Sequence, residues 1–122
     1  ELSLRIMKAD HAICRGLPAN IQWIDEPYWP PTPPVDPKHV DLLVGSFEET
    51  ETGESATTLQ PQFWTYWKGK GRVFGCIPGH YTWTFDDPFF RILLLRGMAW
   101  AANDDPYRFD DLVLRGIAIV DE

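Results

Sequence analysis

The stretch GRVFGCIPGHYTWTFDDPFFRILLLRGMAWAA, residues 71–102, contains a predicted strand, a turn and a predicted helix in direct succession. The apolar residues of 73–77 indicate a β-strand, which stops at the Pro-Gly-His turn 78–80 instead of at an ordinary polar turn. Over 87–100 the apolar side chains recur at helical spacing, after a capping aspartate and with Pro88 in the first turn. A strand that leads through a glycine turn into an amphipathic helix predicts an α/β domain.

The rest of the chain predicts short strands and one further helix. Alternating apolar residues, or apolar runs between turn residues, indicate strands over 2–6, 21–25 and 39–47 and a hairpin with a glycine turn over 62–77. A short helix is expected over 109–114, and a weak extended piece over 117–120. The connecting segments are a turn over 9–18, an extended proline-rich segment over 26–34 and an acidic loop over 48–55.

The composition limits the class of protein. With 122 residues, 44% of them hydrophobic, the chain suits one compact domain. The formal net charge of −7 and the lack of a basic cluster in the sequence argue against a nucleic-acid partner. No apolar run reaches the roughly 18 residues of a membrane span, and residues 1–5 lack the basic start of a signal peptide. We therefore expect a soluble protein, in the cytoplasm or the periplasm.

The two cysteines, Cys14 and Cys76, are too few for a disulfide framework. Each lies beside an isoleucine in an apolar setting, so we expect buried free thiols. Neither cysteine is flanked by the small residues that a strand-to-helix nucleophile elbow needs, and thiol catalysis is therefore not expected.

His80 is the candidate functional residue of the opening stretch. It follows the end of a predicted strand and precedes a helix, which is where open α/β sheets form a ligand crevice. Gly79 before it lets the backbone approach a ligand closely. A histidine in this position can equally cap a main-chain carbonyl at the strand end, and the local sequence leaves both readings open.

Three segments resemble the ThuA-like (trehalose-utilisation) family. DHAICRGLP (10–18) resembles the family's H-P-I-T-x-G-L-P element and IDEPYW (24–29) its x-D-E-x-Y element, while 69–102 resembles its closing G-K-G-R-V-F…G-H…F…P-x-F…L-x-x-G-I-x-W-A signature. The resemblance implies a flavodoxin-like, three-layer α/β fold similar to class I glutamine amidotransferases, and a role in bacterial carbohydrate metabolism. The family's first βα units have no counterpart here, so 1–122 corresponds to the C-terminal half of the domain.

Applied to this sequence, the resemblance implies two catalytic residues, Glu26 and His80, which would share general acid and base work on a sugar hydroxyl. The resemblance implies His11, Asp25, Tyr28 and Gly79 in substrate binding, and the aromatic residues Trp64 and Tyr81 join them as substrate-binding candidates because they lie near the same turns. A divalent metal held by Glu26, His80 and His11 is the less favoured alternative, since the three lie on separate loops. Structural roles compete with these functions: His11 can cap its own turn, and Asp25 can satisfy backbone donors.

Aromatic residues near the same turns favour a carbohydrate ligand, because sugars lay their C–H faces on aromatic rings. These residues are Tyr28, Trp29, Trp64, Tyr81 and Trp83. The sequence has no glycine-rich phosphate loop, which disfavours a nucleotide. Two functions follow: a hydrolase or isomerase acting on a glucoside or its keto derivative, or a non-catalytic carbohydrate-binding or scaffolding domain of a larger protein.

One strong helix for five strands leaves a sheet face without cover. We expect this face to dock onto a preceding segment of the domain or onto another chain, with apolar side chains such as Leu42, Val44 or Phe74 accessible. The helix itself is expected to bury Leu93 and Trp100 against the hairpin strands.

Overall fold

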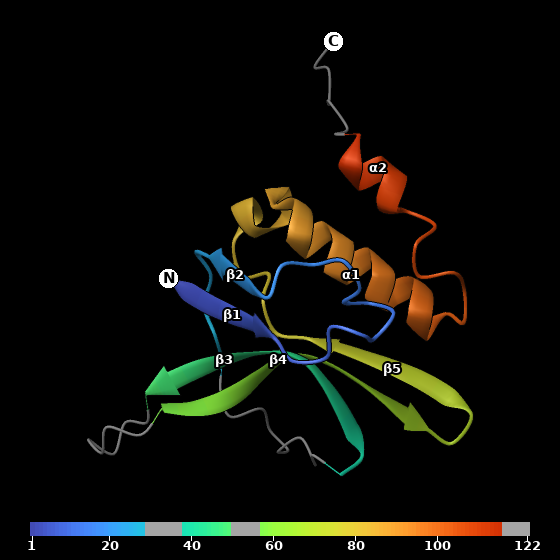
Figure 1. Cartoon of the computed structure of the whole chain (residues 1–122), viewed down its shortest axis with the longest axis horizontal. Helices are drawn as coiled ribbons and strands as arrows, with labels where there is room; N and C mark the ends of the chain where they lie inside the picture. Colours follow the sequence, from blue (N-terminus) through green and yellow to red (C-terminus); the bar gives the residue numbers. More distant parts are fainter. Residues whose placement is uncertain (29–37, 50–56, 116–122) are drawn as a thin grey trace.

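The computed structural model describes residues 1–28, 38–49 and 57–115, whose arrangement is drawn in Figure 1. Five strands form one sheet in the order β2-β1-β3-β4-β5. Their bounds are Leu2–Ile6 (β1), Asn20–Trp23 (β2), Val40–Glu49 (β3), Thr57–Lys68 (β4) and Gly71–Cys76 (β5). The described residues then form the 3-10 helix η1 (Thr82–Asp86), the long helix α1 (Pro88–Ala101) and the short helix α2 (Asp110–Leu114).

Every pairing in this sheet is antiparallel. Between β4 and β5 the chain has only Gly69 and Lys70, with Gly69 at a φ of 60°, and a connection this short returns the strand antiparallel. The α/β class expected from the sequence is confirmed, whereas no parallel strand pair occurs among the described strands. None of the helices in the described residues is long and apolar enough to cross a membrane.

Two expected segments are only partly described. The acidic loop predicted over 48–55 begins later, because Glu48 and Glu49 belong to β3. The remainder of that loop, most of the proline-rich segment 26–34 and the extended piece 117–120 lie outside the described residues. The turn predicted over 9–18 is present and is held by hydrogen bonds from the N–H groups of Cys14 and Arg15 to the carbonyl of His11.

The pairing of β3 with β4 is interrupted by two register shifts, one between Leu42 and Val44 and one between Val44 and Gly45. Leu43 on β3 and Gln62 on β4 are skipped by the pairing, and both side chains are fully buried. One extra residue reverses which side of the sheet the following alternate side chains face. The two bulges therefore let β3 and β4 present apolar residues to both sides of the sheet.

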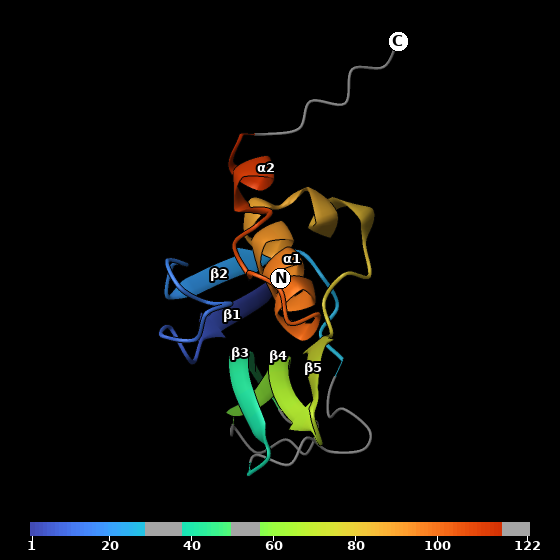
Figure 2. The same cartoon turned by 90° about the vertical axis from the view of Figure 1, so that its right-hand side faces the viewer.

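Helix α1 covers one side of the sheet, and the opposite side is called here the outer face (Figure 1 and Figure 2). The ring of Phe74 on β5 packs against α1, since a Cβ on Gly97 would lie only 2.4 Å from it. Phe74 and the residues paired with it across the sheet face α1. The residues next to them along each strand face the outer side. The outer face thus carries Val40, Leu42, Leu59, Pro61, Trp64 and Tyr66, all half-buried.

The expected accessibility of three apolar residues needs correction. Leu42 lies on the outer face as predicted, but Val44 is fully buried in the core. The bulge at Leu43 places Val44 on the same side as α1, which a regular alternation would not do. Phe74 is half-buried because α1 covers it.

The start of α1 follows the sequence signals. The Asp87 carboxylate accepts hydrogen bonds from the N–H groups of Phe89 and Phe90 at 2.8 and 3.0 Å, and Pro88 is the first helical residue. Leu93 is completely buried, as expected. Trp100, expected to be buried as well, is only half-buried, because at the end of α1 it packs against the edge of the core, where its ring meets the exposed Trp67 edge-on.

Arg96 connects α1 to the rest of the chain. Arg96 is 8% exposed, and its guanidinium donates to the carbonyl oxygens of Ile13 (3.2 Å) and Arg15 (2.7 Å) in the turn after β1. It also pairs with the Asp110 carboxylate at 2.6 Å at the start of α2. A buried guanidinium with several acceptors is satisfied, and it fixes α1 relative to the turn and to α2.

Replacement of Leu93 tests whether α1 is part of the core. Leu93→Ala should lower the free energy of unfolding by about 2–5 kcal/mol, because it removes a completely buried side chain and leaves a cavity. The measurement is denaturant unfolding of the purified chain. Met98→Ala on the same helix is the matched control: Met98 is 58% exposed, and its loss should cost less than about 0.5 kcal/mol. Equal effects of the two substitutions would show that α1 is peripheral.

Candidate functional site

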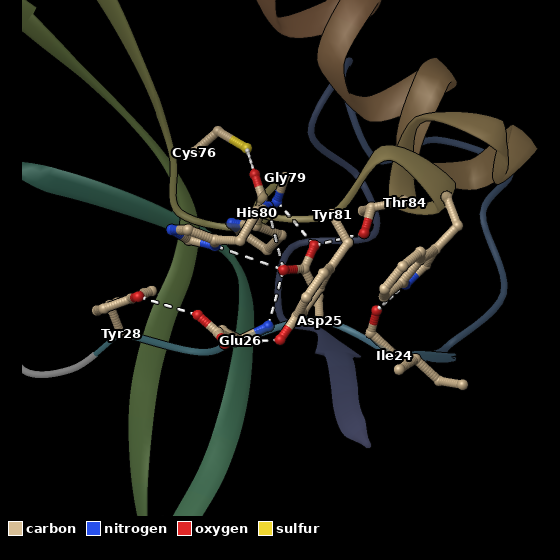
Figure 3. Close-up of polar contacts among 11 residues, drawn as sticks. Ile24, Asp25, Glu26, Tyr28, Cys76, Gly79, His80, Tyr81 and Thr84 are labelled. Atoms are coloured by element: carbon tan, nitrogen blue, oxygen red, sulfur yellow. Dashed lines mark hydrogen bonds and ion pairs between the residues drawn. The ribbon is translucent and has the colours of Figure 1, made fainter.

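The carboxylate of Asp25 joins the end of β2 to the turn that precedes η1 (Figure 3). Its Oδ2 accepts hydrogen bonds from Thr84 Oγ1 (2.6 Å) and from the N–H of Gly79 (2.8 Å). Its Oδ1 accepts from the N–H groups of Glu26 (2.7 Å) and His80 (3.2 Å). These four donors replace the water that a buried carboxylate loses.

The charge state of Asp25 results from two opposing effects. Burial raises the pKa of its carboxyl, because burial disfavours the charged form. The hydrogen bonds from Thr84 and from three main-chain N–H groups lower the pKa by more, so it lies below its ordinary value. Asp25 is therefore ionised at neutral pH, and both of its oxygens are occupied by donors of the protein.

Gly79 supplies the backbone geometry of this turn. Its φ of 120° is a conformation that residues with a side chain rarely adopt. A Cβ at this position would also lie 3.3 Å from the ring of Phe85 and 3.4 Å from that of Phe90. The glycine thus lets its own N–H reach Asp25 while two aromatic rings pack beside it.

The imidazole of His80 lies between Asp25 and Tyr28. Its Nδ1 is 3.4 Å from Asp25 Oδ1, and its ring centre is 4.4 Å from that of Tyr28. The side chain is 35% exposed, and in Figure 3 the other ring nitrogen points away from Asp25. The sequence paired Glu26 with His80 in acid and base work; among the described residues the carboxylate that pairs with the His80 imidazole is that of Asp25.

Glu26 is the exposed acid of the cluster. Its Oε1 accepts a hydrogen bond from the hydroxyl of Tyr81 (2.6 Å), and its Oε2 accepts one from the hydroxyl of Tyr28 (2.9 Å). The two hydroxyls lower the pKa of the Glu26 carboxyl, the Tyr81 bond more than the Tyr28 bond. The same bonds raise the pKa of both phenols. At neutral pH the site therefore presents an ionised carboxylate between two protonated tyrosines.

Tyr81 also connects Glu26 to Trp83. The two rings are stacked, with centres 4.3 Å apart and planes 9° from parallel. The indole N–H of Trp83 donates to the carbonyl oxygen of Ile24 at 2.7 Å. Two contacts hold the indole in place, although the residue is 52% exposed.

Two of the predicted site residues lie apart from this cluster. The Nδ1 of His11 accepts a hydrogen bond from the N–H of Ile13 (3.2 Å), and its ring is 5.8 Å from that of Trp100, at the opposite end of α1 from Thr84. Burial lowers the pKa of His11, which favours the neutral, turn-capping form. Trp64 covers Gly75 on the outer face, where a Cβ would lie 2.2 Å from the indole.

The described residues contain neither a reactive thiol nor a cluster of metal-ligating side chains. Burial raises the pKa of Cys14 and of Cys76 to about 12, so neither thiol ionises near neutral pH. Cys76 lies close to the cluster but donates to the carbonyl of Pro78 at 3.3 Å. In the part of the chain that the structure describes, no three His, Cys, Asp or Glu side chains come together as metal ligands. Trp29 lies outside the described residues.

Sequence reasoning named Trp83 among the aromatic residues that favour a carbohydrate ligand, but it did not name Thr84. The hydroxyl of Thr84 is fully engaged with Asp25, and only the fold brings these two residues together. In the structure the alternation of buried and exposed residues in β2 continues through Asp25 and Glu26, but the sequence does not reveal it, because the exposed Ile24 is apolar. This alternation places Asp25 on the core side and Glu26 on the solvent side.

The fold and the cluster define a small α/β domain with an exposed carboxylate, an imidazole and two tyrosines at one end of its sheet. The family model described as ThuA, trehalose utilisation, matches residues 1–101, and the chain belongs to this family. The family indicates a role in carbohydrate utilisation. No curated protein and no solved structure matches the chain significantly.

The Asp25 hydrogen bonds predict a pH-dependent stability. Because folding lowers the pKa of Asp25, its contribution is complete above the ordinary value of 3.8 and is lost as the pH falls below it towards the folded-state pKa. At pH 7, Asp25→Asn should cost about 1–3 kcal/mol of unfolding free energy, and the difference should shrink below about pH 4. Denaturant melts of both proteins across pH give this difference. Asp86→Asn is the exposed control, and a difference for Asp25→Asn that does not vary with pH would contradict this assignment.

Gly79→Ala should destabilise the chain by about 1–3 kcal/mol, since alanine is strained at a φ of 120°. The main-chain N–H of residue 79 should also move away from Asp25 in this variant. Amide hydrogen exchange at residue 79 would detect this movement as lost protection. Gly71→Ala is a suitable comparison, because it lies at the start of β5 with a negative or extended φ. Normal stability of Gly79→Ala would mean that the turn tolerates a different conformation.

Proposed function

We propose that the Asp25–His80 cluster is a carbohydrate-processing site, acting on a glucoside or its keto derivative by acid and base chemistry. The observation that carries the proposal is the exposed Glu26 carboxylate, held between two tyrosine hydroxyls next to an oriented imidazole. Membership of a family linked to trehalose utilisation supports a sugar as the substrate. The proposed reaction is hydrolysis or isomerisation.

The proposed catalytic roles follow from the charge states. Glu26 is ionised at neutral pH and can accept the proton of a sugar hydroxyl or of water. His80 can exchange a proton through its Nε2, while Asp25 holds the ring from the Nδ1 side. Tyr28 and Tyr81 keep the Glu26 carboxylate in one orientation and can offer their hydroxyls to the substrate.

The substrate class also agrees with the side chains around Glu26. Tyr28 and Trp83 are more than half exposed, and aromatic rings of this kind bind the C–H faces of sugars. Of the other residues predicted to bind substrate, Gly79 and Tyr81 belong to this cluster. Asp25 contributes indirectly, because its carboxylate fixes the turn that carries these residues. His11 and Trp64 lie apart and are better explained by turn capping and sheet packing.

A non-catalytic carbohydrate-binding or scaffolding domain is the second candidate. It is favoured by the fact that both Glu26 oxygens already accept hydrogen bonds from tyrosines. In this reading the carboxylate would bind sugar hydroxyls and would not transfer protons. Turnover decides between the two candidates.

We also propose that this chain forms the C-terminal portion of a flavodoxin-like, three-layer domain, in which another segment or chain covers the outer face. A hollow of about 760 Å³ lies on that face, and its floor includes Val40, Leu42 and Tyr66. No helix of the described residues covers it (Figure 2). A half-buried apolar sheet face is the kind of surface that a third layer covers.

Glu26→Gln and His80→Gln test the proposed catalysis. Incubated with a panel of gluco- and keto-disaccharides, each variant should lose at least about 100-fold in turnover while still binding the sugar, since general acid–base groups contribute about 100- to 10,000-fold. His39→Gln, an exposed histidine at the start of β3, is the matched control and should keep full activity. Sugar binding without turnover in the unmodified protein would favour the non-catalytic domain. If both variants keep their sugar binding and their turnover, the assignment of the site is contradicted.

A further inference from the structure

We propose that Trp83 and the hollow beside it form a second sugar-binding subsite, which takes one ring of a carbohydrate whose neighbouring ring lies at Glu26 and His80. The inference rests on the proposed carbohydrate function and adds to it the length of the ligand. It predicts that the protein prefers a disaccharide to a monosaccharide.

Trp83 has the properties of a fixed binding platform. Trp83 is 52% exposed, which leaves a large apolar surface of the indole in contact with solvent. Tyr81 covers one face of the indole, and the hydrogen bond to the Ile24 carbonyl fixes its edge. A ring held by two contacts loses little conformational freedom when a ligand binds, so the free energy of stacking is retained as affinity.

The hollow beside Trp83 has a volume of about 210 Å³ and lies between β2 and the segment leading into α1. This is below the roughly 300–1,000 Å³ of pockets for drug-sized ligands, and it suits a single sugar ring. The residues that line it are Gln22, Trp23, Ile24, Trp83, Thr84 and Asp87.

Polar groups for sugar hydroxyls surround the hollow. β2 is an edge strand, and the carbonyl of Ile24 points away from β1, since it accepts from Trp83. Strand alternation points the N–H and carbonyl of Gln22 in the same direction, towards the hollow. The Asp87 carboxylate uses Oδ1 to cap α1, and within the described residues Oδ2 makes no hydrogen bond. The hollow thus offers donors and acceptors next to an aromatic surface, the combination that recognises a sugar ring.

One side chain links this subsite to the proposed catalytic centre. Tyr81 stacks on Trp83 with its ring and reaches Glu26 with its hydroxyl at 2.6 Å. The carboxylate and the indole are therefore separated by a single tyrosine. Two linked sugar rings can lie along this tyrosine, one at Glu26 and the other on Trp83.

The test is a two-dimensional NMR titration of the protein with trehalose and, separately, with glucose. The Trp83 indole N–H and the His80 imidazole report the two positions independently. Trehalose should shift both signals, and Trp83→Ala should weaken trehalose binding about tenfold, the free energy expected of one aromatic contact. Trp83→Phe, which keeps a flat ring, should restore most of the affinity. Trp67→Ala is the matched control, because Trp67 is 58% exposed but packs on Trp100 at the other end of α1.

The outcomes separate this inference from the proposed function. A shift at His80 with no shift at Trp83, or unchanged trehalose affinity in Trp83→Ala, would overturn the subsite and leave the proposed function standing. A shift at Trp83 alone would support the subsite and overturn the placement of the catalytic centre. Saturating sugar that moves neither signal would overturn both.

Discussion

A single buried carboxylate holds together two parts of the chain that are far apart in sequence. Asp25 follows the end of β2, and its partners Gly79, His80 and Thr84 belong to the turn and helix that precede α1. A carboxylate without partners in this environment would be strongly unfavourable, and the four hydrogen bonds offset that cost. The positions of His80, Tyr81 and Trp83 all depend on this contact, because it fixes the segment that carries them.

Asp25 and its neighbour Glu26 illustrate how environment separates two identical functional groups. Both carboxyls have a lowered pKa, but for Asp25 the cause is a set of donors within the fold, and for Glu26 it is two tyrosine hydroxyls at the surface. The first carboxylate has no oxygen left for a ligand, whereas the second is open to solvent. Structural and chemical roles are thus divided between adjacent residues by the alternation of a strand.

The sheet has two faces of different character. Helix α1 covers one face, and Arg96 fixes it through the carbonyls of the turn after β1 and through Asp110. The outer face stays apolar and half-buried because the bulges at Leu43 and Gln62 change the direction of alternate side chains. The proposed third layer would cover that face.

The sequence by itself determined the local elements. Helix α1, its Asp87 cap, the β4–β5 hairpin and the buried alternation of β1 follow from periodicity and turn chemistry, which depend on residues close in the chain. The family motifs also placed Glu26, Tyr28, Gly79 and His80 among the site residues, the aromatic residues near the turns added Tyr81, and these five lie together. Only the tertiary structure decided that Asp25 and not Glu26 contacts His80, that Thr84 completes the carboxylate's partners, and that Val44 faces the core. Each of these depends on the register of strands or on contacts between residues more than fifty positions apart or across a bulge, and no local pattern encodes such distances.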